Sequence, residues 1–484
     1  MASQGKPMAS APTIVWLRQD LRLADNPALQ AAIEAGGEVI PVYIHDIKSE
    51  GHWAPGGATL WWLHYALIDL SEQFSKTGAS LIIRSGDSLE ELRNLVKESG
   101  ATQVVWNRRY EPLIVERDTK IKTALRNAGL KVESYNGSLL HEPHRIKNLS
   151  GNPFQVFTPF WKNCLANLKF GTPTKAPKKL VGTRSDIASE SVDSLKLLPK
   201  IKWDAQMRTF WTPTRAGAEK RLKDFISAPV KDYNTARDIP ELDGTSRLSP
   251  YLHFGQISPL EIYTAVKASP HAETKSGERY IAEIGWREFG YHLLHHFNHT
   301  PEKALRAEFD NFPWAPDAKL VRAWQKGKTG FPIVDAGMRQ LWQTGWQHNR
   351  VRMIAASVLV KHLLQPWQSG AAWFWDTLVD ADLASNTLGW QWAGGCGADA
   401  APYFRVFNPV LQGEKFDPQG SFVRQYVPEL AKMPAEWIHK PWEAPADVLK
   451  AAGVTLGVNY PKPAIGLTEG RDRALEAFKN LRAK

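Results

Sequence analysis

The chain has 484 residues, which is too long for one ordinary domain and suits two or three. Hydrophobic residues make up 43% and charged residues 23%, and no apolar run reaches the roughly 18 residues of a membrane span, which excludes a membrane-embedded protein. Cys164 and Cys396 are too few for a disulfide framework, and the N-terminal segment lacks the apolar core of a secretory signal. We therefore expect a cytoplasmic protein.

Two features of the composition are unusual. There are 60 Lys and Arg against 50 Asp and Glu, a net charge of +10, and 20 residues are tryptophan. A basic balance favours a polyanionic partner, first of all nucleic acid, although a generally basic surface gives the same balance. Indoles stack on bases and on planar ligands, but they also fill cores.

Residues 13–145 alternate β-rich runs with amphipathic stretches. The β-rich runs are nearly continuous in apolar residues, as strands buried on both faces are. They lie at 13–20, 38–46, 79–87, 102–110 and 130–138, with helical patterns at 26–37 and 88–100. Ser88 is the expected N-cap of the second helix and Gly100 its stop. This alternation predicts an α/β domain with a parallel, doubly wound sheet.

The remainder of the chain divides in two. Residues 146–215 have little regular pattern and are expected to form an interdomain linker, whereas residues 216–484 show helical periodicity and predict an all-α domain. Residues 1–12 are interpreted as a flexible tail. No G-x-G-x-x-G motif is present, and GKTG at 327–330 lacks the first glycine of a P-loop, so we reject an ordinary nucleotide-binding loop.

Several helical stretches carry side chains of mixed chemistry. Trp346, Asn349, Arg350 and Met353 share one face if residues 346–353 form a helix, and that combination suits a planar ligand with polar edges. The alternative is a helix with a buried Trp and Met and solvated arginines.

A second stretch places a carboxylate between two aromatic side chains. Tyr280, Glu283, Trp286 and Arg287 recur at helical spacing, which indicates either a ligand edge or an amphipathic rim. In a third cluster, at residues 380–392, Asp380 is expected to pair with Arg352. A hydrolase with paired carboxylates is the disfavoured alternative.

Two further clusters suggest anion or metal binding. Residues 245–249 read Thr-Ser-Arg-Leu-Ser, a run suited to phosphate, although ordinary helix caps look the same. His292, His295, His296 and His299 share a helical face. We interpret them as a solvated or phosphate-facing band rather than as metal ligands, and we expect no metal.

Taken in order, these motifs resemble the photolyase/cryptochrome flavoproteins, and most closely a bacterial cyclobutane pyrimidine dimer photolyase of the class I or class III kind. The resemblance covers nearly the whole chain. It is carried by VWLRQDLRLADNPAL, GTSRLSPYLHFG, WREF, TGFPIVDAGMRQL, GWQHNRVRM, DADLASN, GWQW and APYFRVFNP followed by QGEKFDP.

The resemblance implies an N-terminal α/β domain that binds an antenna chromophore, a linker, and a C-terminal helical domain that holds FAD. Arg352, paired with Asp380, would lie beside the isoalloxazine ring, and Asn386 would face its N5. The residues matching the family's FAD contacts are Tyr233, Thr245, Ser246, Arg247, Leu248, Ser249, Trp346, Asn349, Arg352, Asp380, Asp382 and Asn386.

The implied reaction is light-driven repair of cyclobutane pyrimidine dimers in DNA. An electron would pass from excited reduced FAD to a flipped-out dimer and return after the ring opens. The matching catalytic residues are Glu283, Asn349, Met353 and Asn386, and Asn349 and Met353 stand where enzymes for (6-4) lesions carry histidines. The matching DNA and lesion contacts are Arg237, Trp286, Arg350, Trp392 and, more loosely, Lys415.

The resemblance also implies an electron relay and an antenna. Trp390, Trp367 and Trp314 would form the inner, middle and outer members of a chain that passes electrons inwards to the flavin. Asn107 and Glu111 would contact an antenna, either methenyltetrahydrofolate or a deazaflavin, and an empty antenna site is the third alternative. A cytoplasmic bacterial monomer, associated with the nucleoid when bound to damaged DNA, is expected.

One departure from the family pattern and three rival functions complete the expectations. Where close family members read N-N-G-G-W, this chain has Asn386-Thr387-Leu388-Gly389-Trp390. The first rival is a blue-light receptor of the cryptochrome kind, disfavoured by the complete set of lesion contacts. The others are (6-4) repair and a non-catalytic nucleic-acid-binding module.

Overall fold

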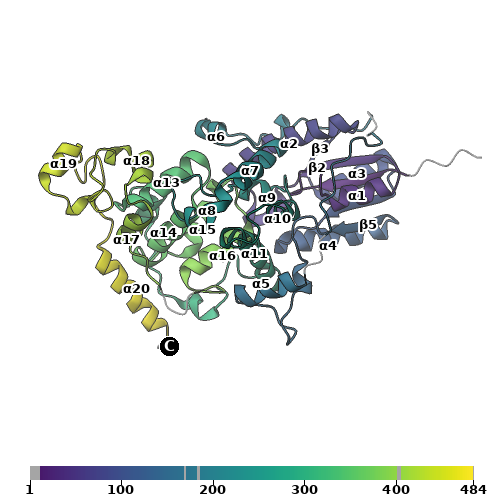
Figure 1. Ribbon diagram of the computed structural model, residues 1–484. Coiled ribbons are helices and arrows are strands. Elements are labelled where there is room, and N and C mark those ends of the chain that lie inside the picture. The colour runs from purple at the N-terminus through teal and green to yellow at the C-terminus, as the bar shows by residue number, and fades with distance from the viewer. Residues whose placement is uncertain (1–10, 168–170, 183–185, 401–404, 483–484) are drawn as a thin grey trace, which may run out of the picture.

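The N-terminal half is built around a five-stranded parallel sheet. The computed structural model describes residues 11–167, 171–182, 186–400 and 405–482; residues 1–10 of the expected tail lie outside them. The strands are β1 (Thr13–Leu17), β2 (Val39–His45), β3 (Ile82–Ser85), β4 (Gln103–Asn107) and β5 (Lys131–Tyr135). Their order, β3-β2-β1-β4-β5, places the first strand at the centre, which confirms the predicted doubly wound sheet (Figure 1).

Alternate side chains of the strands build two cores. Ile14 and Trp16 of β1 pack with residues of α3 (Ser88–Ser99) and α4 (Pro112–Asn127). Val15 and Leu17 point the other way, into a core that includes α1 (Pro27–Glu34) and α2 (Gly57–Thr77). Because both faces are buried, each strand is apolar along its whole length, which explains the continuous apolar runs.

The start of α3 differs by one residue from the prediction. Asp87, not Ser88, is the N-cap, because its carboxylate accepts hydrogen bonds from the backbone N–H groups of Leu89 and Glu90. Ser88 is the first helical residue, and its hydroxyl donates to Asp46 instead. Gly100 ends the helix with φ of 67°, as expected.

The C-terminal half is helical, as predicted. Its helices are α5 (Phe157–Ala166), α6 (Ala205–Phe210), α7 (Arg215–Ser227), α8 (Pro229–Ala236), α9 (Ser249–His253), α10 (Pro259–Lys267), α11 (Lys275–His296), α12 (Ala318–Gln325), α13 (Pro332–Thr344), α14 (Asn349–Ser357), α15 (Trp367–Thr377), α16 (Leu383–Gly394), α17 (Pro409–Phe416), α18 (Ser421–Tyr426), α19 (Ala446–Ala452) and α20 (Leu467–Arg482). A π-helical turn, η5 (Val358–His362), follows α14, and short 3₁₀ turns lie at Lys48–Trp53, Pro143–Arg145, Asp193–Leu195, Ala307–Asn311, Pro428–Leu430 and Pro441–Glu443. Helices α5 and α6 lie within the stretch expected to be linker, and α5 packs against α11.

Helix α11 joins the two halves. Glu288 accepts hydrogen bonds from the backbone N–H groups of Leu140 and His141, each at 3.0 Å, and Arg287 donates to the carbonyl of Ser138 at 2.7 Å. The segment Ser138–His141 follows the last strand of the sheet, so α11 binds the α/β domain through polar side chains as well as through the shared hydrophobic core.

Of the four histidines predicted to form a solvated band, His292 does not belong to it. His292 is buried, and its Nε2 accepts the backbone N–H of Phe154 at 3.0 Å. Burial lowers the pKa of His292 to about 3, so it is neutral at physiological pH. His295 is exposed and His296 half-buried, and α11 ends before His299. Within the described residues, no group of His, Cys, Asp or Glu side chains is arranged to hold a metal ion.

Other expectations concern the cysteines and the membrane. Cys164 and Cys396 are both buried free thiols, in agreement with a structural role. None of the helices in the described ranges is long and apolar enough to cross a membrane.

Glu288 makes the stability of the protein depend on pH. Burial raises the pKa of this carboxyl to about 7, above the 4.5 of a free glutamate, so the folded state binds its proton more tightly than the unfolded state. The contribution is therefore complete below about pH 4.5 and is lost as the pH rises to about 7. Relative to Glu288→Gln, the wild type should lose up to about 3 kcal/mol of unfolding free energy over that range, measured by urea denaturation at several pH values.

The control is Glu72→Gln, which changes an exposed glutamate of α2. Its pH profile should run parallel to that of the wild type. A Glu288→Gln profile that also runs parallel to the wild type would contradict a role for this carboxyl.

Candidate active site

An ion pair at the centre of the helical half joins three elements. Arg352 of α14 donates to both oxygens of Asp380, at 3.1 and 2.9 Å, and Ser249 at the start of α9 donates its hydroxyl to Asp380 at 2.6 Å. Asp380 is buried and Arg352 retains 23% of its side-chain exposure. The predicted pair is therefore present, and its guanidinium remains partly open to a ligand.

Arg247 lies next to an aromatic wall. Its backbone has φ of 50°, and its guanidinium lies over the rings of Phe210 and Trp346, 4.9 and 5.3 Å from their centroids. One nitrogen pairs with Asp243 at 3.1 Å, whereas the buried Nε has no hydrogen-bond partner among the residues described. A desolvated cation with an unused donor suits an anionic group such as phosphate.

Trp346 is not on the helix that carries Asn349 and Met353. Helix α14 begins at Asn349 with His348 as its N-cap, whose ring nitrogen accepts the backbone N–H of Arg350. Trp346 lies in the preceding turn and is buried, so its proximity to the site comes from that turn and not from helical spacing. The expectation of one shared helical face is wrong for this residue.

Asp382 and Asn386 lie at the start of α16. Asp382 is the N-cap, accepting the backbone N–H of Ser385 at 2.8 Å, and its other oxygen accepts the hydroxyl of Tyr291. Asn386 donates its amide to the carbonyl of Ala371 on α15 at 3.1 Å. Both side chains are thus oriented by bonds to neighbouring helices.

The remaining residues predicted to contact FAD are divided between core and site. Leu248 is 1% exposed, and Tyr233 is 6% exposed with its ring against Tyr280 at 5.1 Å. Thr245 and Ser246 are half-buried beside them. The hydroxyls of Thr245, Ser246 and Ser249, the Arg247 donor and the Asp380–Arg352 pair fit a ligand that combines phosphates with a polar-edged ring.

Helices α11 and α14 carry residues that are predicted to contact the lesion. Asn349 is exposed, and its amide nitrogen lies 3.9 Å from the sulfur of Met353, one helical turn away. Trp286 stacks on Phe157, with ring centroids 3.9 Å apart and planes inclined by 7°. One face of this indole is thus covered by Phe157, and stacking on a base would need the opposite face.

The predicted phosphate contacts form ion pairs in the free protein. Arg237 pairs with Glu283, which also lies 3.4 Å from Arg279. Arg350 donates to Asp238 at 2.8 and 3.2 Å. Each of these arginines therefore has an anionic partner before any ligand arrives.

Two further predicted contacts each lie near an aromatic ring. The ammonium of the exposed Lys415 lies 5.2 Å from the centroid of Phe416. Trp392 contacts Phe407 edge to face, with ring centroids 6.2 Å apart, and lines a small cavity with Lys361 and Arg405.

The three predicted relay tryptophans belong to one hydrophobic cluster. Trp390 and Trp367 are 2% and 3% exposed, whereas Trp314 is half-buried at the cluster's margin. Gly370 of α15 lies directly beneath the Trp390 ring, and any larger residue there would overlap the indole. Trp390 and Trp367 are therefore similarly buried, and Trp314 is the most exposed of the three.

The two residues predicted to contact an antenna are already bonded within the α/β domain. Asn107 donates to Asp20 and Asn26, each at 2.7 Å, and accepts the backbone N–H of Ala28. Glu111 pairs with Arg109 at 3.0 Å. A folate at these residues would have to replace some of these bonds.

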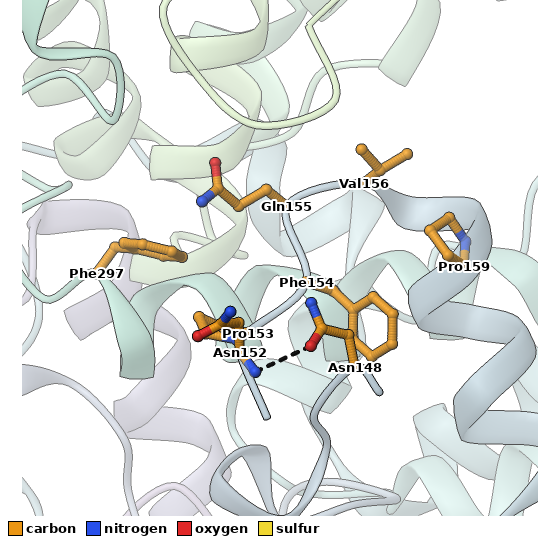
Figure 2. A pocket seen from close by; sticks show the side chains of 8 residues that line it. All are labelled: Asn148, Asn152, Pro153, Phe154, Gln155, Val156, Pro159 and Phe297. Carbon is orange, nitrogen blue, oxygen red and sulfur yellow. Dashed lines mark hydrogen bonds between the residues drawn. The ribbon is translucent and has the colours of Figure 1, made fainter. Parts of the chain in front are cut away.

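A separate open cavity lies beside the linker. It measures about 490 Å³ and is lined by Asn148, Asn152, Pro153, Phe154, Gln155, Val156, Pro159 and Phe297 (Figure 2). Within this lining, the backbone N–H of Asn152 donates to the side-chain oxygen of Asn148. None of the predicted site residues lines it.

Three residues that shape the site escaped the sequence analysis. Phe157 covers Trp286, Tyr291 orients Asp382, and Asp238 holds Arg350. Asp238 directly follows Arg237 in the chain. An acidic residue next to an arginine that is proposed to bind phosphate is the signal that could have identified Asp238.

Comparisons with known proteins agree with this geometry. Residues 13–178 match the family model described as DNA photolyase, and residues 280–480 match that of the FAD binding domain of DNA photolyase. The chain is 51% identical to a deoxyribodipyrimidine photo-lyase of Agrobacterium fabrum, covering 97% of this chain and 98% of that one. It is 39% identical to cryptochrome-1 of Arabidopsis thaliana, covering 97% and 70%. The crystal structure of a class III photolyase from Agrobacterium tumefaciens superimposes with a TM-score of 0.96 at 49% identity, over 100% of both chains.

The Asp380–Arg352 pair provides a test of the site. Asp380→Asn keeps the shape of the side chain but leaves the arginine without its anion, so we expect a loss of about 1.5–3 kcal/mol in unfolding free energy. It should also lower the amount of FAD that copurifies with the protein, measured by absorbance. Asp447→Asn, at an exposed position in the first turn of α19, is the control and should change neither quantity. Normal FAD content in Asp380→Asn would remove this carboxylate from the flavin site.

Proposed function

Because the chain belongs to the DNA photolyase family, we propose that it repairs cyclobutane pyrimidine dimers in DNA with the energy of light. The observation that supports this best is the 51% identity to a deoxyribodipyrimidine photo-lyase over almost the full length of both chains. Asn349 and Met353, which distinguish dimer repair from (6-4) repair in this resemblance, lie one turn apart on the same face of α14. The lower identity to cryptochrome-1 makes the receptor the weaker alternative.

The chain's own residues would hold FAD between the loop before α9 and the helices α14 and α16. Arg247 would bind the diphosphate with its unused Nε, assisted by the hydroxyls of Thr245 and Ser246. Arg352, fixed by Asp380, would bond the polar edge of the ring, and Asn386 would present its amide to the ring from α16. When bound and reduced, FAD supplies the electron that opens the cyclobutane ring after absorbing light.

The protein would bind the flipped dimer through α11, α14 and α16. The face of Trp286 opposite Phe157 and the ring of Trp392 would stack on the two bases and compensate for the stacking lost from the duplex. Glu283 and Asn349 would hydrogen-bond the base edges, and Met353 would contact the dimer as a polarizable apolar side chain. Arg237, Arg350 and Lys415 would bind the phosphates around the lesion.

Trp390, Trp367 and Trp314 would supply the electrons that reduce FAD in the light. The burial of Trp390 and Trp367 and the partial exposure of Trp314 support a path from the interior to solvent. Methenyltetrahydrofolate is the antenna that we propose, with contacts at Asn107 and Glu111 that replace part of their present bonding. We propose a cytoplasmic monomer that associates with the nucleoid through damaged DNA.

A light-dependent repair assay tests the function. The protein is reduced without oxygen and mixed with an oligonucleotide that carries one thymine cyclobutane dimer, and the absorbance of restored thymine is followed first in the dark and then under blue light. Recovery only in the light is expected. Photoreduction of the flavin without any recovery would instead favour the cryptochrome alternative, and repair of a (6-4) lesion alone would overturn the choice of substrate.

The relay can be separated from repair. In Trp390→Phe the first electron donor is missing, so photoreduction of oxidised flavin should slow at least about tenfold, which corresponds to a barrier about 1.4 kcal/mol higher. Repair by chemically prereduced protein should largely survive, because it does not need the relay. Trp324→Phe is a suitable control, since that indole is equally buried and contacts Trp390 edge to face. Equal loss of photoreduction and repair in Trp390→Phe would contradict the assignment.

A further inference from the structure

One carboxylate lies between the two arginines that we assign to DNA phosphates. Asp238 follows α8, and its Oδ1 accepts two hydrogen bonds from Arg350, at 2.8 and 3.2 Å. The same oxygen lies 3.9 Å from Nε of Arg237. A single oxygen thus faces both guanidinium groups, as a phosphate oxygen would.

The two arginines are recessed rather than extended towards solvent. The side chains of Arg237 and Arg350 are 10% and 19% exposed, compared with 29% for Asp238. Arg350 also lies over the ring of Phe416, 4.4 Å from its centroid, and Arg237 over that of Tyr233 at 5.4 Å. The carboxylate and the aromatic rings therefore keep both cations close to the protein surface.

The surroundings of this cluster are cationic. Arg279 and Lys415 lie at its edges, and Glu283 is the second anion, already shared between Arg237 and Arg279. Without Asp238, Arg350 would lose its anionic partner and its side chain would be free to extend. Long cationic side chains that extend from a basic surface bind any nearby DNA phosphate, irrespective of sequence or damage.

We propose that Asp238 is a specificity-determining residue, which keeps Arg350 recessed so that a phosphate reaches it only when the DNA strand follows a flipped dimer into the site. The inference rests on the proposed function. Asp238 accepts from Nε and Nη2 of Arg350 and leaves the Nη1 donors available, so a phosphate that enters with a flipped dimer can bind the recessed guanidinium without breaking this pair. A phosphate of undamaged duplex stays outside the site and would meet Arg350 only if the side chain extended, which the pair with Asp238 opposes. Asp238 therefore weakens binding to undamaged DNA more than binding to the lesion.

The test compares binding of two duplexes of the same sequence, with and without one thymine dimer, to FAD-loaded wild type and to Asp238→Asn in the dark. In Asp238→Asn, affinity for the undamaged duplex should rise about fivefold to tenfold near 0.1 M salt, and the salt slope should steepen by about 0.9, the value for one added phosphate contact. Affinity for the dimer should change less, because Arg350 already binds a phosphate there. The ratio of the two affinities should fall accordingly.

Three variants separate this role from a simple change of charge. Glu116→Gln also removes one negative charge, from an exposed pair with Lys120 on α4, beside the sheet rather than in the helical half (Figure 1). It should leave the salt slope unchanged. Asp238→Glu keeps the carboxylate and should restore discrimination. In Asp238→Asn combined with Arg350→Gln, the gain for undamaged DNA should disappear.

Two results would overturn the inference. Undamaged DNA that binds Asp238→Asn no tighter than wild type, or more weakly, would show that Asp238 does not keep Arg350 away from the phosphates of undamaged DNA. An equal gain in Glu116→Gln would reduce the effect to net charge. If the wild type neither prefers the dimer nor repairs it in light, the proposed function is wrong. If the wild type prefers and repairs the dimer but one of these two results is obtained, only the role of Asp238 is wrong.

Discussion

The rest of the structure depends on the burial of helix α11. Its 22 residues run between the α/β domain and the helical half, and so its polar side chains must find partners on both sides. Arg287 and Glu288 bond the segment that follows β5, while Tyr291 bonds Asp382 at the start of α16. Through these contacts one helix fixes the position of the domains and of a predicted flavin residue.

The same helix carries two side chains that we assign to lesion binding. Glu283 and Trp286 lie one helical turn apart, so fixing α11 fixes the distance between a hydrogen-bond acceptor and a stacking surface. Both side chains already have partners in the free protein, since Glu283 forms an ion pair with Arg237 and Trp286 stacks on Phe157. A site whose charges are paired in advance does not leave an uncompensated charge when no ligand is bound.

The sequence was informative wherever local chemistry determines structure. Continuous apolar runs predicted all five strands, and helical periodicity predicted the second half, because burial alone sets those patterns. The capping error at Ser88 arose because two adjacent residues can both cap, and the hydrogen bond from Ser88 to Asp46 depends on a distant strand end. His292 was misjudged for a related reason, since the segment at Phe154 that covers it belongs to a stretch without a clear pattern.

At the site, too, contacts between residues far apart in the sequence were difficult to predict. Trp346 was placed on a helix by its spacing, but His348 caps that helix after it. The partnership of Asp380 with Arg352 could be predicted from complementary charge, whereas the partnerships of Asp238 and of Asn107 could not, because each depends on which loops the fold brings together. Family resemblance identifies residues that contact a ligand more readily than residues that hold those contacts in place.

The departure from the family pattern after Asn386 lies on one side of helix α16. Asn386 and Trp390 are four residues apart on α16 and both contact α15, at Ala371 and Gly370 respectively. Thr387 and Leu388 lie instead on the side that faces α11, where they line a small cavity with Gly290 and Leu293. Because successive helical residues are separated by about 100°, the substitution changes the packing of α16 against α11 and leaves the face bearing Asn386 and Trp390 intact. Any influence of Thr387 and Leu388 on the flavin must therefore act through the position of α11, which is the helix that already determines where Glu283 and Trp286 lie.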